Sequence, residues 1–244
     1  MRLLLFNIRY GVGSGAAMHV PVPGAGYLLG NPQQLDRLID FIKLQAPDVC
    51  GLIEVDTGSI RSRMVNQAES IAAALEFKSS YETKYGGTSV NNLLPIVRKQ
   101  GNALLAGPNV HHERFHFFDT GIKKLVIELE LDDCAIFLVH LSLKYRHRHL
   151  QLRHLYDLIR KTRKPVIVAG DFNTFWGGDE IYLFQQAAGL HSANVERLPS
   201  YPSNAPRREL DYILHQDPIR VTRFDVPQVQ LSDHLPLVCD FEIG

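Results

Sequence analysis

Polar side chains capable of acid–base and metal chemistry stand at the ends of apolar runs throughout this chain. Asp171 and Asn173 end the run VIVAGDFN, while Asp233 and His234 directly precede the run LPLVCDFEI. Each of these residues alone is typical of a turn or a cap. Because strand ends converge on one edge of the sheets in layered α/β proteins, the whole set predicts a ligand-binding edge. Its members are Asn7, Glu54, His140, Asp171, Asn173, Asp211, Asp233 and His234.

The residue types in this set fit the chemistry of a hard cation. Several carboxylates and an amide oxygen, without a cysteine cluster, suit Mg2+ or Mn2+ better than structural zinc. Such a cation can clamp a phosphoryl oxygen and neutralise the charge that develops on it. Histidines beside acids supply proton transfer near neutral pH. The set therefore indicates metal-assisted chemistry on a phosphate group.

The first half of the chain predicts two strands and two helices that would position these residues. RLLLF and DVCGLIEV are expected to form buried strands that end near Asn7 and Glu54. A Gly- and Pro-rich stretch from 11 to 30 predicts a long loop. The next helix begins at the cap Asn31 and ends at Pro47, with an apolar stripe of Leu35, Leu38, Ile39 and Ile42. A second helix is expected over 66–77, with Asn66 and Glu69 at capping-box spacing.

The second half alternates strand-like and helix-like segments. Four strands are expected from 101 to 140, and Asp132-Asp133 turns the last two into a hairpin. A basic helix, the strand KPVIVAGDF and the short helix EIYLFQQAAG follow, and the chain ends with the strands LDYIL, IRVTRFDV and LPLVCDFEI. Mixed sheets with helices outside, in one α/β domain over residues 1–244, are the most economical interpretation.

Bulk properties are those of an ordinary soluble protein. The 244 residues are 45% hydrophobic and 21% charged, with zero formal net charge, so no overall field draws the chain to nucleic acid or anionic membrane. The three cysteines lie in apolar runs and are expected to be buried and reduced. The apolar stretch after Met1 is too short for a signal-peptide core. We expect a cytoplasmic monomer without stable membrane insertion.

Positive charge is concentrated in residues 144–164. This segment holds eight Lys or Arg and one acid, a net charge of +7. The segment RHRHLQLRH within it is either a solvated helix face or a phosphate-contacting patch, because the helix begins four residues beyond His140.

The order of the motifs resembles a known family. NIRYG, LIEV, the strand-ending His140, AGDFNT, LDYIL and SDHLPL resemble, in this order, signature motifs of the endonuclease/exonuclease/phosphatase superfamily over residues 6–234. The resemblance implies a four-layer sandwich of two packed β-sheets flanked by helices. It also implies metal-dependent cleavage of phosphate esters by attack of water.

The resemblance implies a role for each matched residue. Metal binding falls to Glu54, Asn7 and Asp233. Catalysis falls to five residues: Asp171 would orient and deprotonate water, Asn173 would hold water or phosphate, His234 oriented by Asp211 would contact the phosphate, and His140 would assist the leaving oxygen. Asn102 and Arg207 are candidate substrate contacts. Ile53 replaces the glutamine that often precedes the metal-binding glutamate, and the role of Arg9 is open.

Three functions stay open on the sequence. The +7 segment favours a nuclease-like enzyme that acts on a polyanion. Neutral net charge, and few aromatics among the basic residues, favour a lipid or a small-molecule phosphate ester. A non-catalytic binding module on the same scaffold is the third alternative, which would be expected to have lost a metal carboxylate or a histidine.

Overall fold

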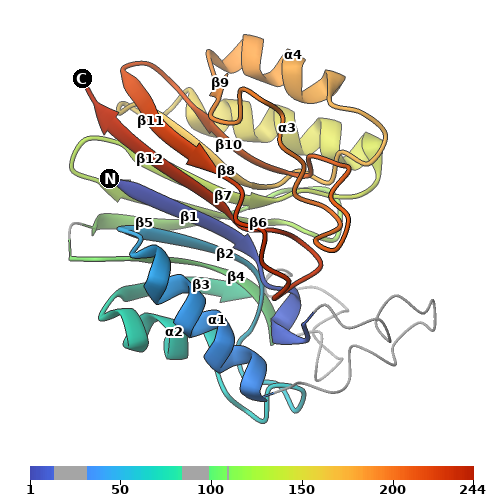
Figure 1. The fold of residues 1–244 in the computed structure, drawn as a ribbon. Coiled ribbons are helices and arrows are strands. Elements are labelled where there is room, and N and C mark those ends of the chain that lie inside the picture. Colours follow the sequence, from blue (N-terminus) through green and yellow to red (C-terminus); the bar gives the residue numbers. More distant parts are fainter. Residues whose placement is uncertain (14–31, 84–98, 109) are drawn as a thin grey trace.

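Two six-stranded sheets lie face to face in the computed structural model, with helices on both outer sides (Figure 1). The structure describes residues 1–13, 32–83, 99–108 and 110–244. Four α-helices occur among these residues, two on each side of the paired sheets. The arrangement is the predicted four-layer α/β sandwich.

The first sheet holds the strands from both ends of the chain. Its order is β11-β12-β1-β2-β4-β3, with β1 and β2 parallel and the other neighbours antiparallel. The bounds are β1 Arg2–Asn7, β2 Val49–Asp56, β3 Lys78–Thr83, β4 Gln100–Ala106, β11 Ile219–Asp225 and β12 Leu237–Ile243.

The second sheet is built from the middle of the chain. Its order is β5-β6-β7-β8-β10-β9, with one parallel pair, β7 and β8. The bounds are β5 Val110–Phe117, β6 Leu125–Leu131, β7 Ala135–His140, β8 Val166–Asp171, β9 His191–Ser192 and β10 Asp211–His215. The turn at Asp132-Asp133 joins β6 and β7, as predicted.

The helices cover the outer faces through apolar stripes. Leu38 and Ile42 of α1 (Pro32–Gln45), with Ile71 of α2 (Gln67–Leu75), pack on the first sheet. Leu155 of α3 (Tyr145–Ile159) and Phe184 of α4 (Asp179–Ala188) pack on the second. A third cluster fills the space between the sheets, with Leu5, Leu104, Leu138 and Ile213 among its members. Apolar residues on both faces explain why the strands read as continuous apolar runs.

Local signals set several helix ends. The Asn66 side chain accepts hydrogen bonds from the backbone of Ala68 (3.1 Å) and Glu69 (3.5 Å) at the start of α2. This cap agrees with the prediction, whereas Glu69 reaches to the Tyr81 hydroxyl (2.5 Å). The proposed cap at Asn31 and most of the predicted loop 11–30 lie outside the described residues.

Three elements differ from expectation. The short edge strands β3 and β9 were not predicted, nor was the 3-10 turn Arg9–Gly11 after β1. The cysteines are free and buried, as expected. Among the described residues, no helix is long and apolar enough to cross a membrane.

Strand register brings the polar strand ends together. His140 of β7 pairs with Asp171 of β8, and Asp171 pairs on its other side with Asp211 of β10. Close packing holds this register, because a Cβ on Gly170 would lie 2.0 Å from the Val139 carbonyl oxygen. A bulge between Ile53 and Val55 places Glu54 in a left-handed conformation (φ 58°) at the neighbouring sheet edge.

Candidate active site

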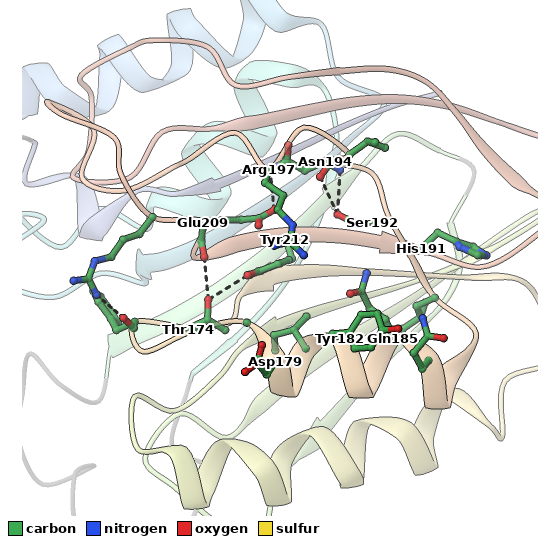
Figure 2. A pocket seen from close by; sticks show the side chains of 18 residues that line it. Thr174, Asp179, Tyr182, Gln185, His191, Ser192, Asn194, Arg197, Glu209 and Tyr212 are labelled. Atoms are coloured by element: carbon green, nitrogen blue, oxygen red, sulfur yellow. Dashed lines mark hydrogen bonds between the residues drawn. The ribbon is translucent and has the colours of Figure 1, made fainter.

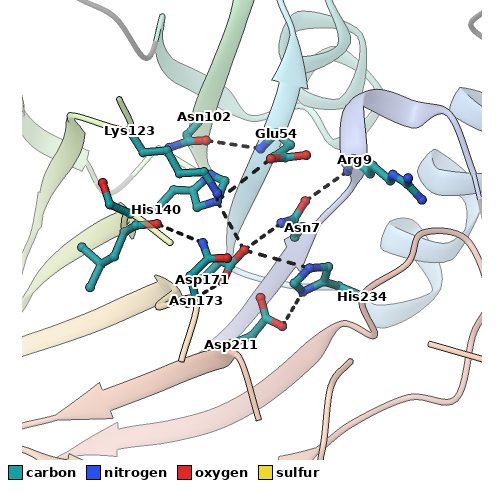
Figure 3. Close-up of polar contacts among 12 residues, drawn as sticks. Asn7, Arg9, Glu54, Asn102, Lys123, His140, Asp171, Asn173, Asp211 and His234 are labelled. Carbon is teal, nitrogen blue, oxygen red and sulfur yellow. Dashed lines mark hydrogen bonds and ion pairs between the residues drawn. The ribbon is translucent and has the colours of Figure 1, made fainter. Parts of the chain in front are cut away.

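Asp171 lies at the centre of a polar network that links the ends of both sheets (Figure 3). Its side chain is 2% exposed. One carboxylate oxygen, Oδ2, accepts a hydrogen bond from Asn7 Nδ2 (3.1 Å) and lies 3.3 Å from His140 Nε2. The other, Oδ1, accepts from the backbone N–H of Asn173 (2.9 Å). Asn7 comes from the first sheet and the others from the second, so Asp171 joins the two sheets.

These donors keep Asp171 ionised. Burial by itself would raise the pKa of the carboxyl group, but the hydrogen bond and charge of His140 oppose it. With the charges of His234 and Lys123 added, the pKa of Asp171 falls below its ordinary value. Asp171 is therefore a carboxylate at neutral pH, as a group that accepts a proton from water must be.

His234 and Asp211 form a buried ion pair beside Asp171. His234 Nδ1 donates to Asp211 Oδ2 (2.7 Å), and Ser200 Oγ donates to the same oxygen (2.6 Å). Burial would lower the pKa of His234, but the charge and hydrogen bond of Asp211 raise it to about 10. The imidazole is therefore protonated at neutral pH, and its Nε2, 4.0 Å from Asp171 Oδ2, carries a hydrogen available to an anion.

Glu54 approaches the network from the first sheet. Its backbone N–H donates to Asn102 Oδ1 (3.2 Å), and its carboxylate lies 4.0 Å from His140 Nε2 (Figure 3). Asn102 is 1% exposed, so its observed contact is with the bulged backbone of Glu54. That contact fixes the residue predicted as the principal metal ligand. Substrate contact by Asn102 stays a prediction.

Asp233 and Arg9 complete the side of the network near Asn7. Arg9 Nη1 lies 3.4 Å from Asp233 Oδ2, and the Arg9 backbone N–H donates to Asn7 Oδ1 (3.1 Å). The left-handed φ of Arg9 (45°) belongs to the turn that follows β1. Arg9 thus contacts two of the predicted metal ligands, Asp233 through its guanidinium and Asn7 through its backbone N–H. The sequence left this role open.

All eight strand-end residues therefore belong to one network, whereas Arg207 does not. The side chain of Asn173 is anchored to the loop after β7, because its Nδ2 donates to the Leu141 carbonyl (2.9 Å). Arg207 is exposed on the loop before β10, where its backbone N–H donates to the Tyr201 carbonyl (2.9 Å). Its contact with substrate stays a prediction.

The sequence did not reveal Lys123. This half-buried lysine lies in the loop before β6, and its Nζ contacts His140 Nε2 (Figure 3). Its charge is one of those that lower the pKa of Asp171. GIKKL carries no motif, so no pattern in the sequence distinguishes Lys123 from Lys124.

RHRHLQLRH is exposed at Arg146, His149 and Arg153, as predicted for a solvated helix face, but Arg148 within it is buried. Its side chain is 1% exposed and pairs with Glu180 of α4. Nη1 donates to the carbonyls of Ser142, Leu143 and Asn173, each at 3.0 Å. Arg148 therefore ties together the loops that follow His140 and Asp171.

Gln151 lies one turn further along α3 and has a similar role. It is fully buried, donates to the carbonyls of Thr120 (3.0 Å) and Lys123 (2.7 Å), and accepts from the Ser142 backbone (2.9 Å). Positions 148, 151, 152, 155 and 159 share one helical face, so the 3.6-residue period was the available signal for burial of both polar residues.

The +7 segment is not one patch at the site. Lys144 and Arg146 lie near the start of α3, while Arg160, Lys161 and Arg163 lie at the other end of a helix about 22 Å long. Lys164 pairs with Glu130 (3.0 Å). The charge of this segment is therefore divided between two ends of the molecule, which weakens its support for a nucleic acid partner.

A hollow lies beside the network, between α4 and the loop before β10 (Figure 2). Its volume is about 700 Å³, and Thr174, Glu209 and Tyr212 lie in its wall. Thr174 Oγ1 donates to the Glu209 carbonyl (2.9 Å) and lies 3.3 Å from the Tyr212 hydroxyl. Burial raises the pKa of the Glu209 carboxyl to about 7. Phe175 and Arg208 also line the hollow, and the Phe175 ring lies 5.5 Å from the Tyr201 ring, which lies 4.9 Å from the His234 ring, between centroids.

The donor set fits a hard divalent cation. Four carboxylates and the Asn7 amide lie in one network, and the cysteines are elsewhere in the cores. Ligand atoms of Asp171, Asp211 and His234 lie within 4.8 Å of one another, and the buried Asp211 Oδ1 has no hydrogen-bond partner among the residues that the structure describes. Because a metal ligand must give up its proton, protonated His234 suits an anion better than a metal.

Comparison with known proteins agrees with this architecture. A family model described as the Endonuclease/Exonuclease/phosphatase family matches residues 4–234. UPF0294 proteins of Yersinia pseudotuberculosis and Yersinia pestis are 38% identical to the chain over 95 residues, which are 38% of the chain and 35% of each relative. The match thus spans about a third of the length of these curated relatives.

Solved structures show the same fold at low identity. The human Nocturnin catalytic domain with bound sulfate anion has a TM-score of 0.73 at 20% identity, covering 100% of this chain and 93% of that one. A mannosyl-6-phosphatase of Bacteroides thetaiotaomicron has a TM-score of 0.71 at 14% identity and covers 100% of both chains. These likenesses show the two-sheet sandwich.

Proposed function

Because the chain belongs to the endonuclease/exonuclease/phosphatase family, a family of phosphoesterases, we propose that it is a divalent-metal-dependent phosphodiester hydrolase with nuclease-like specificity. One observation carries this proposal. Asn7 and Glu54 from the first sheet, with His234 from the loop before β12, meet Asp171 and Asp211 of the second sheet in a single network. Oxygen ligands for Mg2+ or Mn2+, a carboxylate base and a protonated imidazole are thereby brought together.

Three residues form the metal side of the proposed mechanism. Glu54, held by Asn102, and Asn7 and Asp233, both held by Arg9, would bind the cation. The bound cation supplies Lewis-acid stabilisation of the charge on the phosphoryl oxygens. Arg9 and Asn102 keep these ligands in place before substrate arrives.

The remaining residues act on water and phosphate. Asp171, ionised and held between Asn7 and the Asn173 backbone, would orient the attacking water and accept its proton. Asn173 would hold the water or a phosphate oxygen. His234 would donate from Nε2 to a phosphate oxygen, with Asp211 stabilising the imidazolium. His140 would assist the leaving oxygen, and Lys123 beside it adds positive charge.

A panel of substrates tests both activity and specificity. Single- and double-stranded DNA, RNA, a phosphoinositide, a sphingolipid and a cyclic nucleotide are each incubated with Mg2+ or Mn2+, with and without EDTA. We expect EDTA-sensitive hydrolysis of a nucleic acid. Cleavage of only a lipid or small ester would replace the nuclease-like specificity. Absence of hydrolysis throughout would favour a non-catalytic binding module.

Variants connect the activity to the site. Glu54→Ala, Asp171→Ala and His234→Ala should each lower hydrolysis by about 10²- to 10⁴-fold, the range for loss of a positioned acid or base. Asp157→Ala, which removes an exposed carboxylate of α3, is the matched control and should retain full activity. Full activity in the three site variants would overturn the proposal.

A further inference from the structure

Four rings run in sequence from His234 to the molecular surface. The Tyr201 ring lies 4.9 Å from the His234 ring, Phe175 lies 5.5 Å from Tyr201, and Trp176 lies 6.1 Å from Phe175, all between centroids. Phe175 and Trp176 directly follow Asn173 and Thr174 on the loop after β8. The series therefore begins at the proposed phosphate-binding histidine and leads away from it. We call Tyr201, Phe175 and Trp176 the aromatic row.

The outer end of the aromatic row is open to solvent. Trp176 is 81% exposed, whereas Phe175 and Tyr201 are half-buried. Most of the surface of the Trp176 ring is therefore accessible to a ligand. Trp176 lies three residues after Asn173 in the chain, and Phe175 and Tyr201 separate its ring from that of His234.

Cations flank the aromatic row. The Arg208 guanidinium lies over the Phe175 ring, 5.6 Å from its centroid, and Nη1 donates to the Phe175 carbonyl (2.5 Å). Arg207, which precedes Arg208 in the chain, is also exposed. An exposed ring with arginines nearby suits unpaired bases joined by phosphates, since the ring stacks on a base and the cations attract the backbone.

We infer that the aromatic row is a binding subsite for unpaired nucleobases of a single-stranded nucleic acid, in which Trp176 stacks on a base near the phosphate held by His234. The inference deepens the proposed function and rests on it. Phe175 packs edge-to-face on Tyr201 (81° between ring planes) and is covered by Arg208, so the exposed Trp176 ring is the one that offers its face to a base. Stacking of this kind tolerates any base sequence, because every base has a π-face.

Trp176 is the only tryptophan of the chain, so its fluorescence reports on this subsite without a label. The probe is a thymidine hexanucleotide, and the control is a six-residue abasic strand with the same phosphates. Fluorescence is titrated in the wild-type protein with EDTA, and in Asp171→Asn with Mg2+, where the proposed base is absent. We expect quenching by the thymidine strand and much less by the abasic strand.

Binding by the variants is followed through the anisotropy of a fluorescein-labelled thymidine hexanucleotide. Trp176→Ala should weaken binding about 5- to 150-fold, and Trp176→Phe should restore most of it. Tyr145→Ala, which removes an exposed ring of α3 outside the aromatic row, should bind as the wild type does.

Each outcome decides between the occupants. Equal quenching by both strands, or none by either, would overturn the base-stacking subsite. Blue-shifted, enhanced emission with phosphatidylcholine/phosphatidylserine vesicles, without quenching by the thymidine strand, would assign the row to a lipid surface instead. Quenching without hydrolysis of any substrate would overturn the proposed function and leave the subsite. Metal-dependent hydrolysis without quenching would overturn the subsite and leave the proposed function.

Discussion

At the scale of single residues, the pair of His234 and Asp211 sets the charge of the site. The two side chains share a 2.7 Å hydrogen bond in a buried setting, where an imidazolium is stable only beside a carboxylate. Because the ring stays charged at neutral pH, His234 suits the binding of an anionic phosphate oxygen. In the proposed mechanism, Asp211 would act on the substrate only through this ring.

This arrangement predicts that the pKa of His234 depends on Asp211. In metal-free protein, the pKa of His234 is about 10, above the ordinary value of 6.5. The extra stability from this pair is therefore complete below about pH 6.5 and is lost as pH rises toward 10. Asp211→Asn removes the stabilising charge, so the pKa of His234 should fall well below about 10. NMR titration of the His234 ring in both proteins measures the difference, and an unchanged pKa would contradict it.

Sequence reasoning found the polar residues at strand ends, but it left the role of Arg9 open and did not identify Lys123. Glu54 and Asp171 stand out because each interrupts an apolar run. Lys123 and Arg9 carry no such signal, since exposed lysines and arginines are common in loops. Their roles depend on which loops the folded chain brings beside His140 and Asn7.

At the scale of elements, α3 fixes the loops of the site through a buried ion pair. Arg148→Met would leave the Glu180 carboxylate buried without its cation and three carbonyls without their donor. We expect the free energy of unfolding to fall by about 3–5 kcal/mol, measured by urea denaturation. Arg148→Met combined with Glu180→Leu should recover much of this loss, because no unpaired charge remains.

A matched control lies on the same helix. Arg153→Met changes an exposed arginine of α3 and should alter the free energy of unfolding by no more than about 0.5 kcal/mol. Equal effects at positions 148 and 153 would show that the buried ion pair is not what holds the loops.

The close contact of β7 and β8 predicts a second effect. Gly170→Ala would place a Cβ 2.0 Å from the Val139 carbonyl oxygen, which forces the two strands apart beside the paired His140 and Asp171. We expect a loss of about 1–3 kcal/mol in unfolding free energy, measured by urea denaturation, together with a lower kcat. Gly107→Ala is the control and should have little effect, because among the described residues its Cβ would meet Phe77 alone, at an ordinary contact distance of 3.9 Å.

The elements that sequence reasoning missed are those with weak patterns. β3 has the polar sequence KSSYET at the edge of its sheet, and β9 has only two residues. Long apolar runs such as VIVAG were identified because burial on both faces selects apolar residues at every position. Arg148 was misjudged because the composition of its segment was weighed above its helical position.

At the scale of the whole molecule, the site lies where the ends of two sheets meet. Asn7, Glu54 and Asn102 come from strands of the first sheet, whereas His140, Asp171 and Asp211 come from the second (Figure 3). A cation held by Glu54, Asn7 and Asp233 would reduce repulsion among the nearby carboxylates. Metal binding should therefore stabilise the folded chain as well as activate it.

The most direct test of the proposed site is one metal titration with two readouts. Mg2+ or Mn2+ is titrated into metal-free wild-type protein, Glu54→Gln and the control Asp157→Asn, while heat of binding and hydrolysis of a thymidine hexanucleotide are recorded. We expect binding and activity to rise over the same metal concentrations in the wild type and the control. Glu54→Gln should lose at least about 10-fold in affinity, and its activity should fall with it. Unchanged binding and hydrolysis in Glu54→Gln would contradict the assignment of this network as a metal-dependent active site.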